Sequence, residues 1–341
     1  MGKSFTGDQI HITKTDTGQA QFNDYIKIAR PDNWVKNLFM VPGMIFAYAY
    51  FQPPLTFNLF VNVLIGLLSA CFIASANYVI NEFLDIECDR HHPVKKERSL
   101  VKRRVNPKMI YLEYALLASI GIILASLITV KFLGTAVFFL IMGIIYNVPP
   151  MRSKDKPYLD VITESINNPI RFALGWFIFT PSLGVPSTKW DLDWINTFPP
   201  ASIIIAYWMG GAFLMATKRF AEYRLIADAN QATLYRKSFR FYNEHKLLIS
   251  MFFYAITCAF FLAIFLAKNR IELILTFPFF ALLFSWYLRI GLLNNSPVQR
   301  IKGLHRRKWF MTYLVLFCIL FCVLMFVDIP WLHWFLRNSN N

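Results

Sequence analysis

The sequence is poor in charged residues, and this shortage excludes an ordinary soluble protein. Only 16% of its 341 residues are charged, whereas soluble domains carry roughly 25%. Hydrophobic residues make up 56% of the chain, and Phe alone occurs 34 times. A soluble fold of this size could not bury so much apolar surface, but a lipid bilayer accommodates it. The composition therefore predicts a membrane protein rather than one or two soluble domains.

Several familiar site signatures are also missing. The five cysteines have neither the spacing of a metal site nor that of a disulfide framework. Four of them lie in apolar segments, where Cys packs as a small residue, and nothing beside Cys88 marks it as a nucleophile. The sequence has no Gly-rich phosphate loop and no His or Cys cluster typical of zinc or haem. Any chemistry must therefore rest on Asp, Glu, Asn, Lys and Arg.

Apolar segments long enough to cross a bilayer recur along the chain. A spanning helix needs about 20 apolar residues, and Pro42, Pro53 and Pro54 make the first candidate the weakest. The nine candidates are residues 38–56, 58–81, 109–130, 132–149, 158–184, 199–217, 246–267, 271–293 and 310–335. The sequence thus predicts an all-α, polytopic membrane protein. Residues 22–335 would form one transmembrane domain, and residues 1–21 a disordered cytoplasmic tail.

Lys and Arg gather on one side of this arrangement. Of the 35, 29 lie in the first 37 residues or in four loops that would share a side, and only five lie on the other side. The four loops are residues 90–108, 152–156, 218–246 and 289–308. By the positive-inside rule the N-terminus is cytoplasmic, and nine spans place the C-terminus outside. We expect a multi-pass protein of the cell (inner) membrane without a cleavable signal peptide.

This distribution also explains the net charge of +15. In a soluble protein such a charge would suggest nucleic acid, but here it follows from topology, so we expect no nucleic-acid partner. A basic surface remains that suits phosphate-bearing substrates and anionic lipids.

An acidic motif ends the second apolar segment. Asn77, Asn81, Asp85 and Asp89 recur every four residues, with Glu82 among them. On a helix such a row drifts only about 40° per step, so its members would share one broad face. Like charges at this spacing destabilise a helix unless a partner neutralises them, and oxygen-only ligands suit Mg²⁺. The alternative is an ordinary polar helix end.

Basic residues follow this motif at once. The run from Arg90 to Lys108 carries eight Lys and Arg, including Lys95 and Arg98. Such side chains can bind phosphate oxygens. The neighbouring His91 and His92 are expected to be exposed, with a surface or phosphate-contacting role rather than metal binding.

A second polar cluster surrounds the fifth candidate span. Tyr146 and Lys154 precede the span, and Asp160, Glu164 and Arg171 fall on one helical face within it. Ionisable residues inside a span are costly and usually face a cavity or a partner. The alternative is an internal Glu164–Arg171 pair that holds the bundle together.

Two further polar segments are weaker signals. Lys218, Arg219 and Glu222 end the sixth span, where basic residues are expected from topology alone. Lys36 lies before the first span beside Trp34, in a pairing common at membrane interfaces. All four segments would face the cytoplasm, where two acidic clusters could hold Mg²⁺ against a diphosphate while Lys and Arg bind its remaining oxygens.

The acidic motifs resemble those of the UbiA superfamily of intramembrane prenyltransferases. The first motif of that family reads N-D-x-x-D-x-x-x-D, and here Glu82 replaces its first Asp in Asn81-Glu82-x-x-Asp85-x-x-x-Asp89. The second motif pairs acids at i, i+4, as Asp160 and Glu164 do. Over residues 22–335 the resemblance implies nine helices, a Mg²⁺-complexed diphosphate donor and a polyprenyl-type lipid.

Within that superfamily, three segments look like the decaprenyl-phosphate phosphoribosyltransferase branch. They are Arg30-Pro-x-x-Trp34-x-Lys36-Asn37, Asp89-Arg90-x-His92-Pro93-x-Lys95-x-x-Arg98 and Lys218-Arg219-x-Ala-Glu222. The segment from Tyr146 to Arg171 departs from the pattern. The resemblance implies transfer of phosphoribose from phosphoribosyl diphosphate to a polyprenyl phosphate.

The resemblance also implies roles for the residues of these motifs. Catalysis would fall to Asp85, Asp89, Asp160 and Glu164, and metal binding to Glu82, Asp85, Asp89 and Asp160. Substrate would contact Asn77, Asn81, Lys36, Arg90, Lys95, Arg98, Tyr146, Lys154, Arg171, Lys218, Arg219 and Glu222.

Two alternatives remain at this level. A prenyltransferase would move an isoprenoid from its diphosphate to an aromatic or other acceptor at the same metal site, but would have less need of the basic run after Asp89. A transporter would also use buried charges such as Glu164 and Arg171. The few polar residues on the outer side disfavour it.

Overall fold

The structure is a computed structural model that describes residues 18–180, 197–226, 228–293, 296–299 and 307–337. These residues form helices and turns, with one isolated bridge between Gln19 and Arg104 and no strand. The expected tail therefore lies outside the described residues as far as residue 17. Beyond it, Ala20 bonds to the backbone of Arg104, and the first helix, α1, spans Phe22–Ile28.

Seven helical segments in the described part of the chain are long and apolar enough to cross a membrane. They are α3 (Phe57–Leu84), α6 (Pro107–Ser126), α7 (Val130–Asn147), α11 (Ala201–Ile226), α13 (Glu244–Asn269), the segment Ile271–Gly291 and α16 (Lys308–Phe326). The segment Ile271–Gly291 consists of η5 (Ile271–Thr276) and α14 (Phe277–Gly291). The all-α membrane architecture is confirmed, while the count of nine stays a prediction.

Two predicted spans are broken into shorter helices. The first becomes the 3-10 helix η1 (Pro31–Met40) followed by α2 (Val41–Phe51), with Pro42 in the first turn of α2. The fifth becomes α8 (Leu159–Ser165) and α9 (Asn167–Phe179). Pro169 explains the second break, because its ring cannot follow the carbonyl four residues earlier in a continuous helix.

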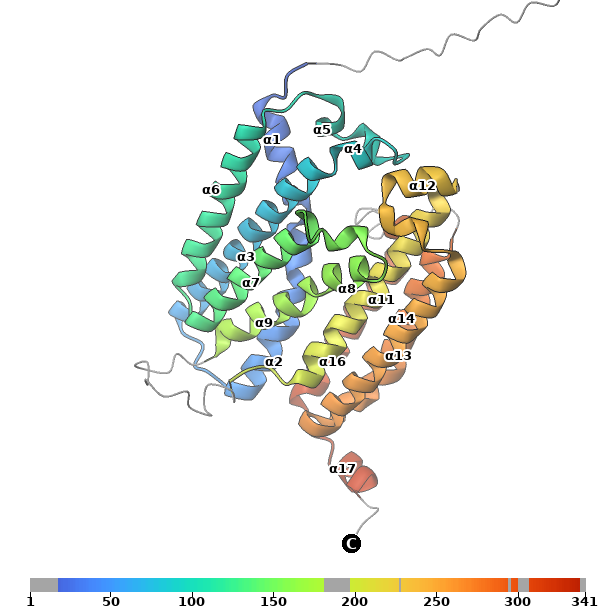
Figure 1. The fold of residues 1–341 in the computed structure, drawn as a ribbon. Helices are drawn as coiled ribbons and strands as arrows, with labels where there is room; N and C mark the ends of the chain where they lie inside the picture. The colour runs from blue at the N-terminus through green and yellow to red at the C-terminus, as the bar shows by residue number, and fades with distance from the viewer. Residues whose placement is uncertain (1–17, 181–196, 227, 294–295, 300–306, 338–341) are drawn as a thin grey trace, which may run out of the picture.

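The bundle packs these broken helices against each other in its interior. Helix α9 lies against α2 and α7, α3 packs on α6 and α7, and α11 packs on α13 (Figure 1). Gly43 and Gly175 permit the contact of α2 with α9, because a Cβ on either would lie 2.0 Å from a backbone oxygen of the opposing segment. Outward faces stay apolar, as Phe252 and Phe260 of α13 show, which suits contact with lipid.

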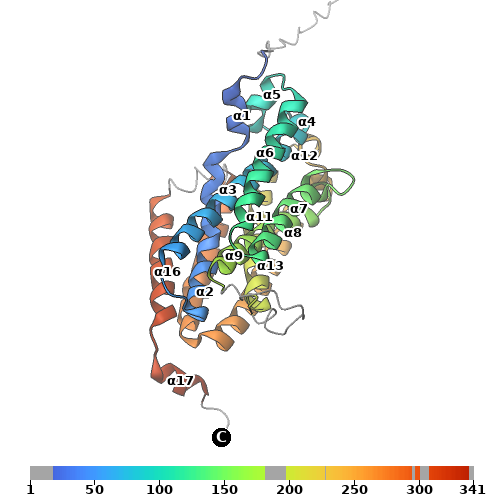
Figure 2. The same ribbon diagram turned by 90° about the vertical axis from the view of Figure 1, so that its left-hand side faces the viewer.

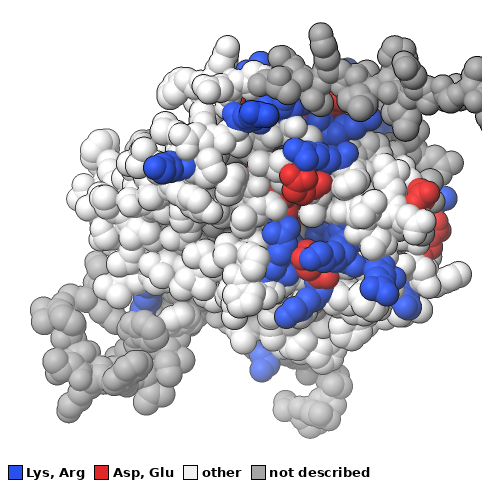
Figure 3. Space-filling view, turned by 45° about the horizontal axis from the view of Figure 1, so that its top comes forward, with Lys and Arg blue, Asp and Glu red and all other residues white. Residues whose placement is uncertain are grey.

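The short elements gather at one end of the bundle. They are α1, α4 (Ile86–Asp89), η2 (Lys95–Glu97), α5 (Ser99–Lys102), η3 (Ser153–Asp155), α12 (Ala229–Tyr235) and η4 (Lys237–Arg240). Figures 1 and 2 show α1, α4, α5 and α12 at this end, with α17 (Pro330–Arg337) at the other. Figure 3 shows Lys, Arg, Asp and Glu side chains interleaved on this end, which we call the polar end.

Candidate active site

The first acidic motif sits where α3 reaches the polar end. The helix stops at Leu84, and Asp85 has non-helical angles (φ −101°, ψ 2°) before α4 begins at Ile86. The predicted row of four residues on one face is therefore interrupted, and Asp85 and Asp89 have different basic partners.

Asp85 is held by two cations from the segment after α7. Its Oδ1 lies 2.6 Å from Lys154 Nζ and 3.0 Å from Arg152 Nη2. Burial alone would raise the pKa of Asp85, but the charge and hydrogen bond of Lys154 hold it below its ordinary value. Lys154 also donates to Asn147, which accepts a second hydrogen bond from Asn81. The structure thus joins Asn81, Asp85 and Lys154 in one network.

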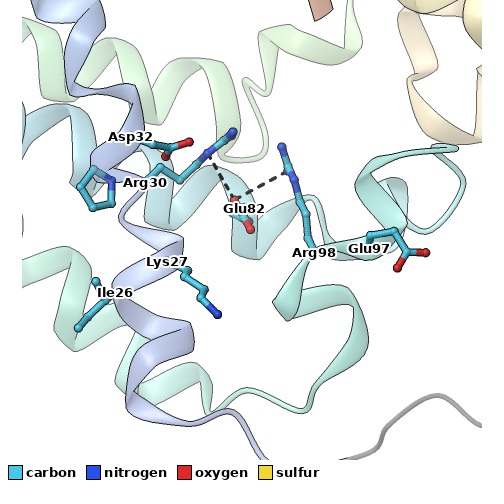
Figure 4. A pocket seen from close by; sticks show the side chains of 8 residues that line it. Ile26, Lys27, Arg30, Asp32, Glu82, Glu97 and Arg98 are labelled. Atoms are coloured by element: carbon cyan, nitrogen blue, oxygen red, sulfur yellow. Dashed lines mark ion pairs between the residues drawn. The ribbon is translucent and has the colours of Figure 1, made fainter. Parts of the chain in front are cut away.

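Asp89 and Glu82 share a different cation, Arg98. Its Nη1 lies 2.5 Å from Asp89 and 3.9 Å from Glu82, which is also 4.0 Å from Arg30 (Figure 4). Arg30, Glu82 and Arg98 border an open cavity of about 460 Å³. Its lining residues are Ile26, Lys27, Arg30, Pro31, Asp32, Glu82, Glu97 and Arg98. Three of these residues are basic and three are acidic, so a phosphate in this cavity could bind Lys27, Arg30 and Arg98, and a metal ion could bind the carboxylates beside them.

In the second acidic motif, Asp160 is fully buried and surrounded by donors. Tyr242 donates to its Oδ1 at 2.6 Å, while Ser238 and Arg219 donate to its Oδ2 at 3.2 Å. Arg236 lies 3.8 Å from the same oxygen. In this arrangement Asp160 fixes α11 and η4 to α8, and its role as a metal ligand stays a prediction.

Arg219 connects the acids of the second half of the site. Its guanidinium, 1% exposed, lies 2.5 Å from Glu164, 2.8 Å from Glu222 and 3.2 Å from Asp160. Tyr146 completes the group by donating to Glu164 at 2.7 Å and accepting from Arg219 at 3.1 Å. Four of the predicted site residues therefore meet at Arg219.

Lys95 links the loop after the first motif to α11. Its Nζ lies 3.4 Å from Glu222 and donates to the hydroxyl of Tyr235. Burial would lower the pKa of Lys95, but the Glu222 carboxylate raises it above its ordinary value, so the ammonium stays charged. Glu222 also pairs with Arg219, so basic side chains connect the loop after the first motif to the acids of the second. We call the connected group the charged layer; its members are Glu82, Asp85, Asp89, Lys95, Arg98, Tyr146, Arg152, Lys154, Asp160, Glu164, Arg219 and Glu222.

Several predicted site residues lie apart from this layer. Asn77 donates to the Phe139 carbonyl at 3.0 Å, in the contact between α3 and α7. Arg90 forms an exposed pair with Glu87 at 2.8 Å. The alternative pairing of Glu164 with Arg171 is wrong, because Arg171 bonds instead to Asn37 and to a backbone carbonyl.

His92 also differs from expectation, because it is only 3% exposed. Its Nδ1 accepts hydrogen bonds from the backbone N–H groups of Val94 and Lys95 at 3.0 and 3.1 Å. Burial and the nearby Lys95 lower the pKa of His92 to about 3, so the ring is neutral and its Nε2 carries the proton. This Nε2 has no hydrogen-bond partner among the described residues.

The contribution of α12, η4 and the adjoining Tyr242 to the site was not predicted from the sequence. Tyr235, Arg236, Ser238 and Tyr242 all contact residues of the charged layer. Arg236 looked like one more topology signal. Aromatic residues at 235, 239 and 242 of this loop have helical spacing, and this pattern could have indicated a packed segment rather than a solvated one.

The donor set fits a hard divalent cation, although the described residues include no preformed cluster of three His, Cys, Asp or Glu around a metal position. Glu82 and Asp89 both approach one guanidinium, so a single cation between them could replace it. Carboxylate and amide oxygens are the ligands that Mg²⁺ takes, usually together with substrate phosphates. Arg98 and Lys154 could then shift from carboxylates to phosphate oxygens.

These features define a helical membrane protein with a layer of interleaved acids and bases at one end, suited to a polyanionic ligand. The sequence profile of the UbiA prenyltransferase family matches residues 38–311. This is most of the chain, so the protein belongs to that family, whose members are transferases.

Three relatives are named decaprenyl-phosphate phosphoribosyltransferase. The one from Mycolicibacterium smegmatis is 26% identical over 222 residues, covering 65% of this chain and 63% of its own length. Those from Corynebacterium glutamicum and Mycobacterium tuberculosis are 27% and 26% identical, covering 64% of this chain each and 59% and 66% of their own lengths. The matches span less than two thirds of each relative.

The fold is similar to solved structures of the same family. A UbiA homolog from Archaeoglobus fulgidus bound to GPP and Mg²⁺ has a TM-score of 0.63 at 20% identity, covering 89% of this chain and all of its own. A digeranylgeranylglyceryl phosphate synthase gives 0.57 at 15% identity, covering 89% of this chain and 98% of its own. At these identities the similarity concerns the fold alone.

Proposed function

We propose that the protein transfers phosphoribose from phosphoribosyl diphosphate to a polyprenyl phosphate, with Mg²⁺ as cofactor. The observation that carries this proposal is the cavity beside Glu82, in which the basic side chains of Lys27, Arg30 and Arg98 stand beside three carboxylates that could hold a metal ion. A prenyl donor has one charged end, whereas phosphoribosyl diphosphate has a second phosphate on C5 of its ribose. These cations adjoin the first acidic motif and would suit that phosphate.

The proposed roles follow from the contacts at the site. Glu82, Asp85 and Asp89 would hold Mg²⁺, which when bound neutralises the diphosphate and makes it a better leaving group. Asp160 and Glu164 would orient Arg219 and would not coordinate the metal directly, because all three residues meet in one buried network. This assignment modifies their predicted catalytic role.

The reaction itself is a displacement at the anomeric carbon of the ribose. An oxygen of the lipid phosphate would form the new C–O bond while the bond from that carbon to the diphosphate breaks, and the bonding electrons leave with the diphosphate. Lys95, Arg98 and Arg219 would position the anions and stabilise the developing charge, as positioned cations do in phosphoryl transfer. No protein nucleophile is required.

The relatives support phosphoribosyl diphosphate as the donor, and the distribution of Lys and Arg supports an orientation of the protein in the membrane. The three named relatives carry decaprenyl-phosphate phosphoribosyltransferase in their names, and each matches about two thirds of this chain. We propose further that the polar end faces the cytoplasm of a cell (inner) membrane, because most Lys and Arg lie in its segments.

A prenyltransferase is the second candidate. The observation in its favour is the solved homolog with GPP and Mg²⁺, which shares this fold. A prenyl diphosphate would use the acidic motifs in the same way but would leave Lys27, Arg30 and Arg98 of the cavity without a phosphate.

Donor binding distinguishes the two candidates. Purified protein in detergent is heated with Mg²⁺ and either phosphoribosyl diphosphate or geranyl diphosphate. A ligand at about 100 times its dissociation constant stabilises by about 2.7 kcal/mol, so we expect a clear rise in Tm with phosphoribosyl diphosphate only.

Two variants locate this effect. Arg98→Gln should weaken the stabilisation, whereas Lys237→Gln, which changes an exposed residue, should keep it. Stabilisation by geranyl diphosphate alone would favour the prenyltransferase.

A further inference from the structure

Three basic residues near the charged layer have no carboxylate partner. Lys36, Arg171 and Lys218 form no ion pair with any acid in the described part of the chain. Most basic side chains of the layer do: Arg98, Arg152, Lys154 and Arg219 each lie within 3.2 Å of a carboxylate. Among the described residues, the same part of the molecule therefore contains cations in close ion pairs and a separate set without a carboxylate in direct contact, although the charges of Glu164 and Glu222 still act on Lys218.

Arg171 is the most deeply placed of the three. It is 5% exposed on α9, two turns beyond Glu164 of α8. Its Nε donates to Asn37 at 2.9 Å and its Nη1 to the Asn167 carbonyl at 3.1 Å, while its guanidinium lies 4.8 Å from the centre of the Phe139 ring. Neutral groups thus satisfy part of its hydrogen-bonding capacity and none of its charge.

The position of this guanidinium is fixed by its neighbours. Asn37 is 2% exposed, and its Nδ2 donates to Cys71 Sγ, so its Oδ1 is directed to Arg171. A buried charge with no counter-ion costs several kcal/mol. Such an arrangement is expected where a ligand completes the site.

Lys36 and Lys218 extend this set of cations toward the charged layer. Lys36, half-buried in η1, has its Nζ 5.3 Å from the centre of the Tyr78 ring, and the charge of Arg171 also acts on Tyr78. Lys218, half-buried in α11, comes one residue before Arg219 of the charged layer. An anion that reached both lysines would be attracted by both ammonium groups.

We propose that Lys36, Arg171 and Lys218 bind the phosphate of the lipid acceptor at a position distinct from the donor cavity beside Glu82. This inference rests on the proposed function and names the second substrate's site within it. The surroundings favour a lipid phosphate over the donor. Arg171 lies beside Phe139 of α7 and directly precedes Phe172 of α9, and both aromatic residues belong to the hydrophobic core. An apolar tail would pack beside such residues more readily than a ribose would.

The location of Lys218 also favours an acceptor phosphate at this site. Lys218 adjoins Arg219 in sequence, and the charges of Glu164 and Glu222 act on its ammonium group. A phosphate held by Lys218 would therefore approach the charged layer from the membrane side. The donor cavity borders the same layer at Glu82 and Arg98, so the two substrates would meet between the acidic motifs.

The test measures acceptor binding without turnover. A short-chain polyprenyl phosphate, the matching polyprenol and inorganic phosphate are titrated into wild-type protein and into Lys36→Gln, Arg171→Gln and Lys218→Gln. We expect polyprenyl phosphate to bind wild type more tightly than either partial ligand. Each substitution should weaken its binding roughly tenfold or more, because a charge-assisted contact is lost. Polyprenol binding should stay unchanged.

Two control variants make the result specific. Lys36→Arg should restore affinity, since it keeps the charge, and Lys237→Gln should match wild type. If Arg171→Gln does not fold, the affinities of Lys36→Gln and Lys218→Gln for polyprenyl phosphate still test the inference. The inference is overturned if wild type does not prefer the phosphate over polyprenol, or if Lys36→Gln and Lys218→Gln both bind polyprenyl phosphate like wild type.

The proposed function is judged separately from this inference. Its donor is tested by the Mg²⁺-dependent binding of phosphoribosyl diphosphate to wild type. If wild type does not bind phosphoribosyl diphosphate but still binds polyprenyl phosphate, the proposed donor is rejected. If wild type binds phosphoribosyl diphosphate and the lysine variants bind polyprenyl phosphate like wild type, this acceptor site is rejected.

Discussion

At the scale of single residues, an arginine contributes very differently to the stability of the fold according to how deeply it is buried. Arg219 is 1% exposed and within 3.2 Å of three carboxylates, whereas Arg90 forms one pair in which both side chains are more than half exposed. A partly or fully buried charge that loses its partner is strongly destabilising, while an exposed pair contributes little.

We therefore predict different outcomes for Arg219→Leu and Arg90→Leu. The first leaves Asp160, Glu164 and Glu222 without their shared cation, and the free energy of unfolding should fall by roughly 3–5 kcal/mol. The second should change it by less than about 1 kcal/mol. Denaturant unfolding in detergent micelles measures both, and equal losses in the two variants would contradict the network around Arg219.

The sequence supplied many residues of the candidate site but few of their partners. Asp85, Glu82 and Asp89 could be recognised because acids at the end of an apolar helix are costly. Their cations could not be assigned, because every loop on the predicted inner side is rich in Lys and Arg. Lys154 pairs with Asp85 across 69 residues of sequence, a contact that only the packing of α7 beside α3 creates.

At the scale of elements, the glycines are of two kinds, according to whether another backbone approaches them closely. A Cβ at Gly175 of α9 would lie 2.0 Å from the Met40 carbonyl oxygen, whereas a Cβ at Gly134 of α7 would meet nothing within 4 Å. The first position requires glycine because two backbones approach there, and the second does not.

We predict that Gly175→Ala costs roughly 1–3 kcal/mol, because the added methyl group forces α9 away from η1. Gly134→Ala should leave stability unchanged or raise it by up to about 1 kcal/mol through its better helix propensity. Thermal unfolding of both variants in the same detergent gives the comparison. If Gly175→Ala unfolds at the wild-type temperature, the close approach of these elements is wrong.

The observed helix boundaries show where hydrophobic patterns alone do not predict the ends and breaks of helices. The long spans α3, α6, α7 and α13 were predicted close to their observed bounds, because long apolar runs identify helices well. Helix α11 was predicted to end at residue 217 but continues to Ile226 through the polar residues of its last turns. The break between α8 and α9 was missed, although Pro169 is a known breaker. Asp160 and Glu164 therefore lie on a short helix separate from Arg171, and these acids pair with α11 instead.

At the scale of the whole molecule, the polar end carries α1, and α17 lies at the opposite end (Figure 2). The split of Lys and Arg between the two sides predicts that the polar end is cytoplasmic. We expect reporter fusions after Asn106 and Asn230 to report the cytoplasm and a fusion after Asn341 to report the outside. A cytoplasmic C-terminus would require an even number of spans and would remove a helix from the nine-span prediction.

The central claim is that the charged layer transfers phosphoribose with the help of Mg²⁺, and one measurement tests it directly. Purified protein is incubated with Mg²⁺, labelled phosphoribosyl diphosphate and polyprenyl phosphate, and the lipid fraction is examined for label. The matched control is the double variant Asp85→Asn, Asp89→Asn. We expect a labelled lipid with wild type, and a rate lower by on the order of 10²-fold or more with the variant. The account is contradicted if label reaches lipid only from a geranyl-type diphosphate, or if the variant keeps the wild-type Mg²⁺-dependent rate.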